Sequence, residues 1–193
     1  MPKTETEARQ FVYQTISNQP ELMLILRQIN SLHLAQGALA AGAIRNSVWQ
    51  VLHGQPVALG TDIDVVFFDP ARPYSDNLVI QAQLQKQCPQ YHWEVKNEVY
   101  MHTYDIADAQ PFTDTTDAIA HFVETPTCVG AYLDDRDELH LIAPYGVSDL
   151  VNLQCRLVPI FSARTYGDIY HDRIAKKQWA SRWPRLHIVE PEA

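Results

Sequence analysis

"GTDIDVVFFD", residues 60–69, places two aspartates at the start of a strongly apolar run. The apolar residues predict a buried strand over residues 62–68, with Asp62 and Asp64 at its beginning. Alternate residues of a strand point to the same face of a sheet, so the two carboxylates should project together. Like charges on one face repel each other, and each resists leaving water. The pair therefore either lies in solvent or shares a cation.

A hard divalent cation would satisfy both carboxylates. Mg²⁺ typically takes one or two protein carboxylates and leaves its other positions to water and substrate phosphates. A third carboxylate would complete a two-metal site. Glu94 and Glu98 lie on the polar face of a second predicted strand, residues 92–102, and spacing alone leaves both open. For Glu98, an exposed residue paired with Lys96 is the simpler interpretation.

The segment before the aspartates is typical of a phosphate-binding turn. Small residues, 37–42, lead into a predicted helix over residues 43–53. Helix N-termini and closely approachable backbone are common phosphate sites. Gly42 and Ala43 are therefore candidate phosphate-binding residues. Arg45, in the first turn, either adds a cationic contact or is an exposed helix residue.

The remaining patterns predict a mixed α/β (α+β) domain built on a small sheet. Helices are expected over residues 4–16, 20–33, 75–88, 113–124, 147–157 and 164–183, and two strands around a turn at 134–138. We interpret residues 1–193 as one domain, with a core at about 20–110 and a C-terminal hairpin and helices at 111–193. His102 would share the strand face of Glu94, in a structural role.

Composition limits the class of protein. The chain has 193 residues and a net charge of -8, and an acidic protein is not a natural general binder of nucleic acid or anionic membranes. The three cysteines lack metal-ligand spacing, and the N-terminal segment lacks a signal-peptide pattern. Reduced thiols and a cytoplasmic location are expected. No apolar stretch approaches the roughly 20 residues of a membrane span, so no membrane partner is expected.

Basic and aromatic residues alternate near the C-terminus, from Arg156 to Arg185. This composition fits either a surface that binds an acceptor or nucleic acid, or a solvated helix face whose tryptophans pack on the core. The second interpretation is favoured, so nucleic acid stays a possible partner that is not favoured.

A family resemblance adds to this interpretation. The turn at Gly42, the Asp-x-Asp pair and a carboxylate on a later strand resemble the polymerase-beta-like nucleotidyltransferase superfamily. "AGAIRNSVWQVLHG", "TDIDVVFFD", "WEVKNEVYMH" and "KKQWASRWPRL" look like a bacterial family of nucleotidyltransferases of undetermined substrate. The resemblance extends from about residue 39 to about residue 186.

The resemblance implies a minimal nucleotidyltransferase fold, a short mixed sheet with helices packed on it. It implies that Asp62 and Asp64 hold Mg²⁺, that Glu94 is the third acid, and that Gly42 lies against a triphosphate. The superfamily usually has Gly-Gly or Gly-Ser at the turn, where this chain has Gly42-Ala43.

The expected function is therefore transfer of a nucleotidyl group from an NTP such as ATP to an unidentified acceptor, with Mg²⁺ as cofactor and release of pyrophosphate. The alternative is a catalytically silent nucleotide-binding or protein-interaction module with the same fold. Ala43, which lacks a hydroxyl group, slightly favours the alternative.

Overall fold

The structure is a computed structural model that describes residues 3–60, 62–103 and 110–191. Its helices are α1 (Glu5–Ser17), α2 (Pro20–Asn30), α3 (Gly42–Leu52), α4 (Asp76–Gln87), α5 (Thr115–Ala120), α6 (Ser148–Val151), α7 (Ala163–Lys176) and α8 (Trp179–Arg182), with 3₁₀ turns η1 (Glu98–Tyr100) and η2 (Thr125–Thr127). Its strands are β1 (Ala38–Ala40), β2 (Ile63–Phe67), β3 (Trp93–Asn97), β4 (Gly130–Leu133), β5 (Leu139–Ile142), β6 (Gln154–Cys155) and β7 (His187–Ile188).

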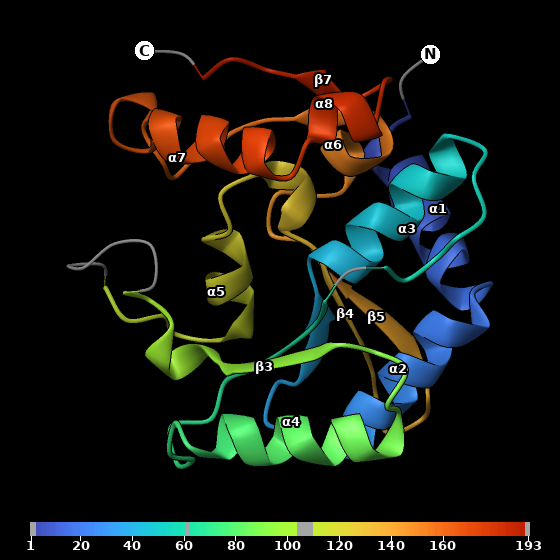
Figure 1. Cartoon of the computed structure of the whole chain (residues 1–193), viewed down its shortest axis with the longest axis vertical. Coiled ribbons are helices and arrows are strands. Elements are labelled where there is room, and N and C mark those ends of the chain that lie inside the picture. Colours follow the sequence, from blue (N-terminus) through green and yellow to red (C-terminus); the bar gives the residue numbers. More distant parts are fainter. Residues whose placement is uncertain (1–2, 61, 104–109, 192–193) are drawn as a thin grey trace.

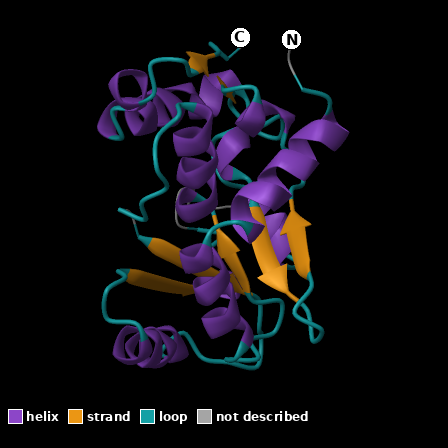
Figure 2. Ribbon diagram, turned by 90° about the vertical axis from the view of Figure 1, so that its right-hand side faces the viewer, coloured by secondary structure: helices purple, strands orange, loops and turns teal. Residues whose placement is uncertain are grey.

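A five-stranded mixed sheet forms the centre of the fold. Its order is β3-β2-β1-β4-β5, and β2 and β3 pair in parallel while the other neighbours are antiparallel. Figure 1 shows α4 at one end of the molecule and α7 and α8 at the other, and Figure 2 shows the strands between them. The predicted mixed α/β class, a short mixed sheet with helices packed on it, is confirmed.

The parallel pair requires a crossover connection, and α4 provides it. Strands that run in parallel cannot be joined by a tight turn, so the chain must return along a helix before entering β3. Side chains of α4 also form hydrogen bonds with the outer edge of β3. Gln81 accepts from the backbone N–H of Val95 (3.3 Å), and Asn77 accepts from the backbone N–H of Asn97 (3.1 Å). This edge of the sheet is thereby partly capped.

The central strand β1 has no counterpart in the sequence predictions. Its three residues are fully buried, and Leu39 pairs with Val65 on one side and Ala131 on the other. Alanine has little intrinsic preference for strands, so a three-residue Ala-Leu-Ala segment gives almost no local signal. Tertiary pairing on both edges makes it a strand.

The second predicted strand is shorter than expected. It ends at Asn97 and continues as η1, so the prediction that residues 92–102 form one strand, with Glu98 and His102 on the face of Glu94, is wrong. The Asn97 side chain accepts from the N–H of Asp69 (3.1 Å) and of Val99 (3.4 Å), and donates to the carbonyl of Asp69 (2.8 Å). These bonds turn the chain and tie the ends of β2 and β3 together.

The C-terminal segment is also divided differently from the prediction. The single helix expected over residues 164–183 is broken at Gln178, which has a φ of 52° and separates α7 from α8. The helix expected over 147–157 is four residues long and leads into β6. Trp179 and Trp183 are buried and pack edge-on against Trp49 of α3, with ring centroids 5.4 and 5.6 Å apart.

Two further expectations concern a membrane span and the state of the thiols. None of the helices among the described residues is long and apolar enough to span a bilayer. The three cysteines are free and buried.

Replacing Asn97 by Ala tests the link between β2 and β3. The variant should lose about 1–3 kcal/mol of unfolding free energy, because it leaves the half-buried N–H and C=O groups of Asp69 without their side-chain partner. Urea denaturation measures the change, and Gln87→Ala, at the exposed end of α4, is the control. Equal stability of the two variants would contradict this account of η1.

Candidate active site

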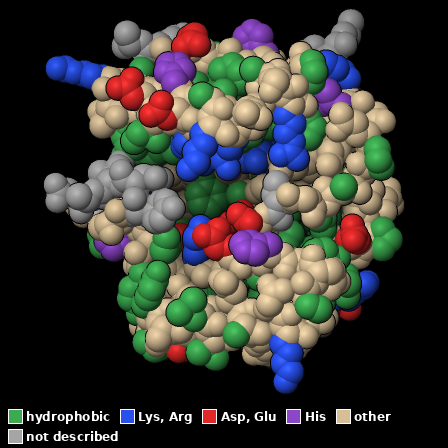
Figure 3. All heavy atoms as spheres, in the orientation of Figure 1, with side chains coloured by type: hydrophobic (Ala, Val, Ile, Leu, Met, Phe, Trp, Pro, Cys, Tyr) green, Lys and Arg blue, Asp and Glu red, His purple; other side chains and the backbone are tan. Residues whose placement is uncertain are grey.

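A cleft of about 490 Å³ lies between the β2–β3 pair and the C-terminal helices. The sequence-predicted residues Asp62, Asp64, Glu94, Gly42 and Arg45 all line it. Figure 3 shows the hollow with acidic side chains gathered on its lower side and Lys and Arg side chains along its upper side. The fold thus brings the predicted acids and the predicted phosphate-binding turn to one place.

The acidic side is built by the parallel register of two strands. Asp64 of β2 pairs directly with Glu94 of β3, so the two carboxylates leave the sheet side by side. Both residues are half-buried, whereas the buried residues on either side of them, Ile63, Val65 and Val95, anchor the strands in the core. The position of the carboxylates is therefore fixed by backbone pairing.

Asp62 is oriented differently from the other two acids. It is exposed just before β2 begins, and its Oδ1 lies 2.7 Å from Nδ1 of the exposed His92. As a result, Asp62, Asp64 and Glu94 do not form a group whose ligand atoms all lie within 4.8 Å of one another. Because both members of the Asp62–His92 pair are solvent-exposed, rotating Asp62 toward Asp64 would cost little.

Burial and neighbouring charges raise the pKa values of two acids in the cleft. Burial raises the pKa of Asp64 to about 6, with Glu94 and Asp62 adding to the rise and Lys96 opposing it. Burial likewise raises the pKa of Glu98 to about 7, with Asp64 adding and Lys96 opposing. Negative charge on this side of the cleft is therefore costly without a cation.

The donor set fits a hard divalent cation. The groups that converge here are carboxylate oxygens, and those of Asp64 and Glu94 are held at one level of a parallel strand pair. The raised pKa of Asp64 indicates a place where positive charge would be favourable. Asp64 and Glu94 would hold such an ion, with Asp62 joining after rotation of its side chain.

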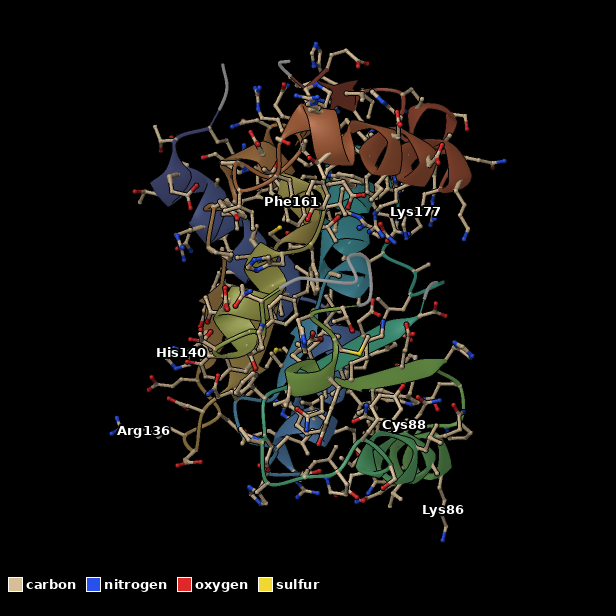
Figure 4. The ribbon with its side chains drawn as sticks, turned by 90° about the vertical axis from the view of Figure 1, so that its left-hand side faces the viewer. Lys86, Cys88, Arg136, His140, Phe161 and Lys177 are labelled. Atoms are coloured by element: carbon tan, nitrogen blue, oxygen red, sulfur yellow. The ribbon has the colours of Figure 1, made fainter. Side chains whose placement is uncertain are left out.

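The opposite wall of the cleft carries three cationic side chains. Arg45 comes from α3, Arg173 from α7, and Lys177 from the residue that follows α7. Figure 4 shows Lys177 below the C-terminal helix, on the side that faces the β-sheet. Burial lowers the pKa of Lys177, and repulsion from Arg45 and Arg173 lowers it further. Repulsion among these cationic side chains makes the wall receptive to anions.

Arg45 is held rigidly in this wall. It is only 4% exposed, it donates to Thr127 Oγ1 (2.8 Å) and Asn46 Oδ1 (3.1 and 3.2 Å), and its guanidinium lies 4.5 Å from the ring centroid of Trp179. The alternative that Arg45 is an exposed helix residue is thus wrong, because α3 is enclosed by the C-terminal helices.

Arg173 is anchored by a buried carboxylate. Glu124 is fully buried, and its Oε1 accepts from Nε of Arg173 at 2.6 Å while Oε2 lies 3.4 Å from Nη2. A buried charge is stable only when it is paired and hydrogen-bonded, so this ion pair fixes α7 over the cleft.

The turn before α3 has an unusual backbone. Ala41 has a φ of 51°, a conformation that L-residues with a Cβ rarely adopt, and it leads β1 directly into the helix. Gly42 follows and lines the cleft. The side chain of Ala43 packs in the core instead, so at this position the backbone alone is a candidate for contact with phosphate.

For four residues of the cleft the sequence favoured a simpler role than their position indicates. Glu98 was a candidate third carboxylate for which an exposed position was preferred, and Lys96 was its expected partner. Arg173 and Lys177 belonged to the basic segment for which a solvated helix face was favoured over a binding surface. Glu98 reaches the cleft through η1, which local patterns do not predict. The signal for Arg173 and Lys177 was present in the basic C-terminal segment, but its position over the acids depends on tertiary packing.

A second group of possible metal ligands lies elsewhere. Within the described ranges, Asp134, Glu138 and His140 are the residues whose ligand atoms all lie within 4.8 Å of one another. They belong to the β4–β5 hairpin, on the opposite side of the view in Figure 4 from Lys177. Asp134 Oδ1 accepts from the N–H groups of Arg136 and Glu138, and Oδ2 lies 3.0 Å from His140 Nε2, so these contacts stabilise the turn.

The raised carboxyl pKa values predict a pH dependence of stability. The folded chain retains protons on Glu98 that the unfolded chain releases above its ordinary pKa of 4.5, so this residue costs progressively more stability as pH rises from about 4.5, and the cost levels off above about pH 7. Glu98→Gln should therefore stabilise the protein more at about pH 8 than at about pH 5, measured by urea denaturation in the presence of a chelator. Glu138→Gln, on the exposed hairpin, is the control. If the difference in unfolding free energy between Glu98→Gln and wild type stays constant with pH, the burial of this acid is contradicted.

Glu124→Gln tests the anchor of the cationic wall. The variant should lose about 3 kcal/mol of unfolding free energy, because a buried ion pair is broken. Arg9→Ala, which removes an exposed ion pair with Glu5, should cost less than about 1 kcal/mol. Thermal and urea denaturation give both values, and similar losses in the two variants would show that Glu124 does not anchor α7.

Comparison with solved structures supports the architecture. One solved structure is 36% identical in sequence to this chain and superposes with a TM-score of 0.83, covering 93% of this chain and 94% of its own. It is an NMR structure described as revealing a CCA-adding enzyme head domain. CCA-adding enzyme structures described as complexes with CTP and with ATP are each 14% identical, with TM-scores of 0.58 and 0.55. These share the fold, and the match covers 43% and 42% of their chains.

Comparison with sequences defines the family. A search among proteins of curated function found no match. Residues 27–188 match the family described as Nucleotidyltransferase. The matched segment covers most of the chain and includes every residue of the cleft. The chain therefore belongs to the nucleotidyltransferase family, a family of transferases.

Proposed function

We propose that this protein transfers a nucleotidyl group from an NTP to an acceptor in a reaction that depends on Mg²⁺ and releases pyrophosphate. The observation that carries the proposal is the pairing of Asp64 with Glu94 at the floor of a cleft whose opposite wall is cationic. A metal-bound triphosphate has the matching charge pattern, with cations on one side and free phosphate oxygens on the other. Membership of the nucleotidyltransferase family supports the same reaction class.

Each part of the cleft has a task in this proposal. Asp62, Asp64 and Glu94 hold the divalent cation, which when bound neutralises the phosphates and activates the attacking oxygen. The backbone at Gly42 approaches the triphosphate at the N-terminus of α3, where N–H groups favour anions. Arg45, Arg173 and Lys177 offset the negative charge that develops on the leaving pyrophosphate. Catalysis then depends on positioning and charge neutralisation, without a protein nucleophile.

The apolar part of the cleft leaves room for a base or an acceptor group. Met101, Phe112, Phe122 and Val123 line it, and the Phe112 ring lies 5.0 Å from that of His121. Because CTP and ATP are the nucleotides in the CCA-adding enzyme complexes, they are the first donors to test. The acceptor is the part of the reaction that the cleft leaves open.

Asp64→Asn tests the proposal. The variant should keep its fold and lose metal-dependent NTP binding and at least about 100-fold of pyrophosphate release, because the paired carboxylates no longer hold the cation. Pyrophosphate release is measured with each NTP and a pool of acceptors, and metal binding by calorimetry. Asp135→Asn, in the exposed β4–β5 turn, is the matched control and should behave like wild type.

Three results are informative. Loss of metal-dependent NTP binding and of pyrophosphate release in Asp64→Asn, but not in Asp135→Asn, supports the transferase. Metal-dependent NTP binding that needs Asp64 but gives no turnover with any acceptor supports the silent nucleotide-binding module. Unchanged binding and turnover in Asp64→Asn would show that the chemistry lies outside this cleft.

A further inference from the structure

Lys96 lies inside the acid cluster. It follows Glu94 by two positions on β3, so both side chains leave the same face of the sheet, and its Nζ lies 3.1 Å from Oε1 of Glu94. In the parallel register it is paired with Val66, which also lines the cleft. The Lys96 side chain is therefore part of the floor, and it is less exposed (27%) than the Glu94 side chain that it contacts (43%).

The charges around Lys96 are strongly unbalanced. Asp62, Asp64, Glu94 and Glu98 all line the floor, and Lys96 is the one cationic side chain that β2, β3 or η1 contributes to the described cleft. The Lys96 ammonium group, 3.1 Å from a Glu94 oxygen, relieves part of the repulsion among these carboxylates.

We propose that Lys96 is a built-in counter-cation that holds Glu94 and competes with the divalent ion for the acid cluster, and so sets the metal affinity of the site. The proposal rests on the proposed function, because it takes Asp64 and Glu94 as the metal ligands. Lys96 is a positioning residue in this account: it acts on the cation through Glu94 and through its own charge.

The competition follows from position and charge. A divalent ion bound between Asp64 and Glu94 would lie within a few ångströms of the ammonium group and be repelled by it. Partial burial weakens the screening of this repulsion by salt. One oxygen of Glu94 also accepts from Lys96, so full engagement of that carboxylate by metal requires the ammonium group to move away. The same contact orients Glu94 and stabilises the floor before metal binds.

Lys96→Met tests the inference, because it removes the charge and keeps most of the side-chain volume. The matched control is Lys86→Met, an exposed lysine at the end of α4 that points away from the cleft in Figure 4. Calorimetric titration with Mn²⁺ and with Ca²⁺ should show binding about fivefold tighter or more in Lys96→Met than in the control. The melting temperature of Lys96→Met should fall below that of the control without metal and recover more on adding Mn²⁺.

Lys96→Gln separates charge from positioning. It retains a hydrogen-bond donor for Glu94 but no charge, so it too should bind Mn²⁺ more tightly than wild type. It also serves if Lys96→Met does not fold. Affinity that is unchanged or weaker in both variants overturns the proposal and makes Lys96 a support of the metal ligands instead of their competitor.

Asp64→Asn distinguishes failure of this inference from failure of the proposed function. If Mn²⁺ binding of the wild type persists in Asp64→Asn, the cluster is not the metal site, and the proposed function and the role of Lys96 both fail. If Asp64→Asn abolishes binding while the Lys96 variants bind like wild type, the role of Lys96 alone fails.

Discussion

Two carboxylates held at the same level of neighbouring parallel strands impose the main electrostatic constraint on this fold. The pairing of Asp64 with Glu94 follows from the register of β2 and β3, and their backbone positions cannot separate without breaking that register. The register itself depends on the crossover through α4 and on the Asn97 side chain, which joins the ends of both strands. Rigid backbone pairing thus holds together like charges that would otherwise move apart.

The opposite side of the cleft shows how the chain compensates. Positive charge comes from α3 and from the C-terminal segment, which are brought over the sheet by the packing of Trp49 with two tryptophans near α8. Buried Glu124 fixes Arg173 in this wall. An acidic floor facing a cationic wall explains how a protein of net charge -8 can offer a site for a polyanion. It also gives the C-terminal helices a part in the site.

The family comparison and the geometry of the cleft support different conclusions about function. The chain matches almost the full length of a structure that reveals a CCA-adding enzyme head domain, but less than half of the CCA-adding enzymes solved with nucleotides. Family membership therefore establishes the reaction class, and the cleft supports the proposed use of metal and triphosphate.

The sequence predicted those parts that depend on local chemistry. The Asp-x-Asp pattern, the apolar run after it and the turn at Gly42 were sufficient to predict strand β2 and to bring Asp62, Asp64 and Gly42 forward as site residues, whereas the choice of Glu94 came from the family resemblance. The central strand β1 could not be predicted, because alanine-rich strands are specified by their neighbours. The end of β3 depends on a side chain, Asn97, that bonds 28 residues back along the chain. The cationic wall depends on long-range packing, so Arg173 appeared as one basic residue among many.

Crystals soaked with Mn²⁺ and an NTP analogue that cannot be cleaved test the central claim most directly. Anomalous scattering locates manganese independently of any assumption about the ligands. Our account predicts a peak within coordination distance of Asp64 and Glu94, with Asp62 turned away from His92 toward the ion and the triphosphate beneath Arg45, Arg173 and Lys177. A peak at Asp134, Glu138 and His140 with none in the cleft would contradict it.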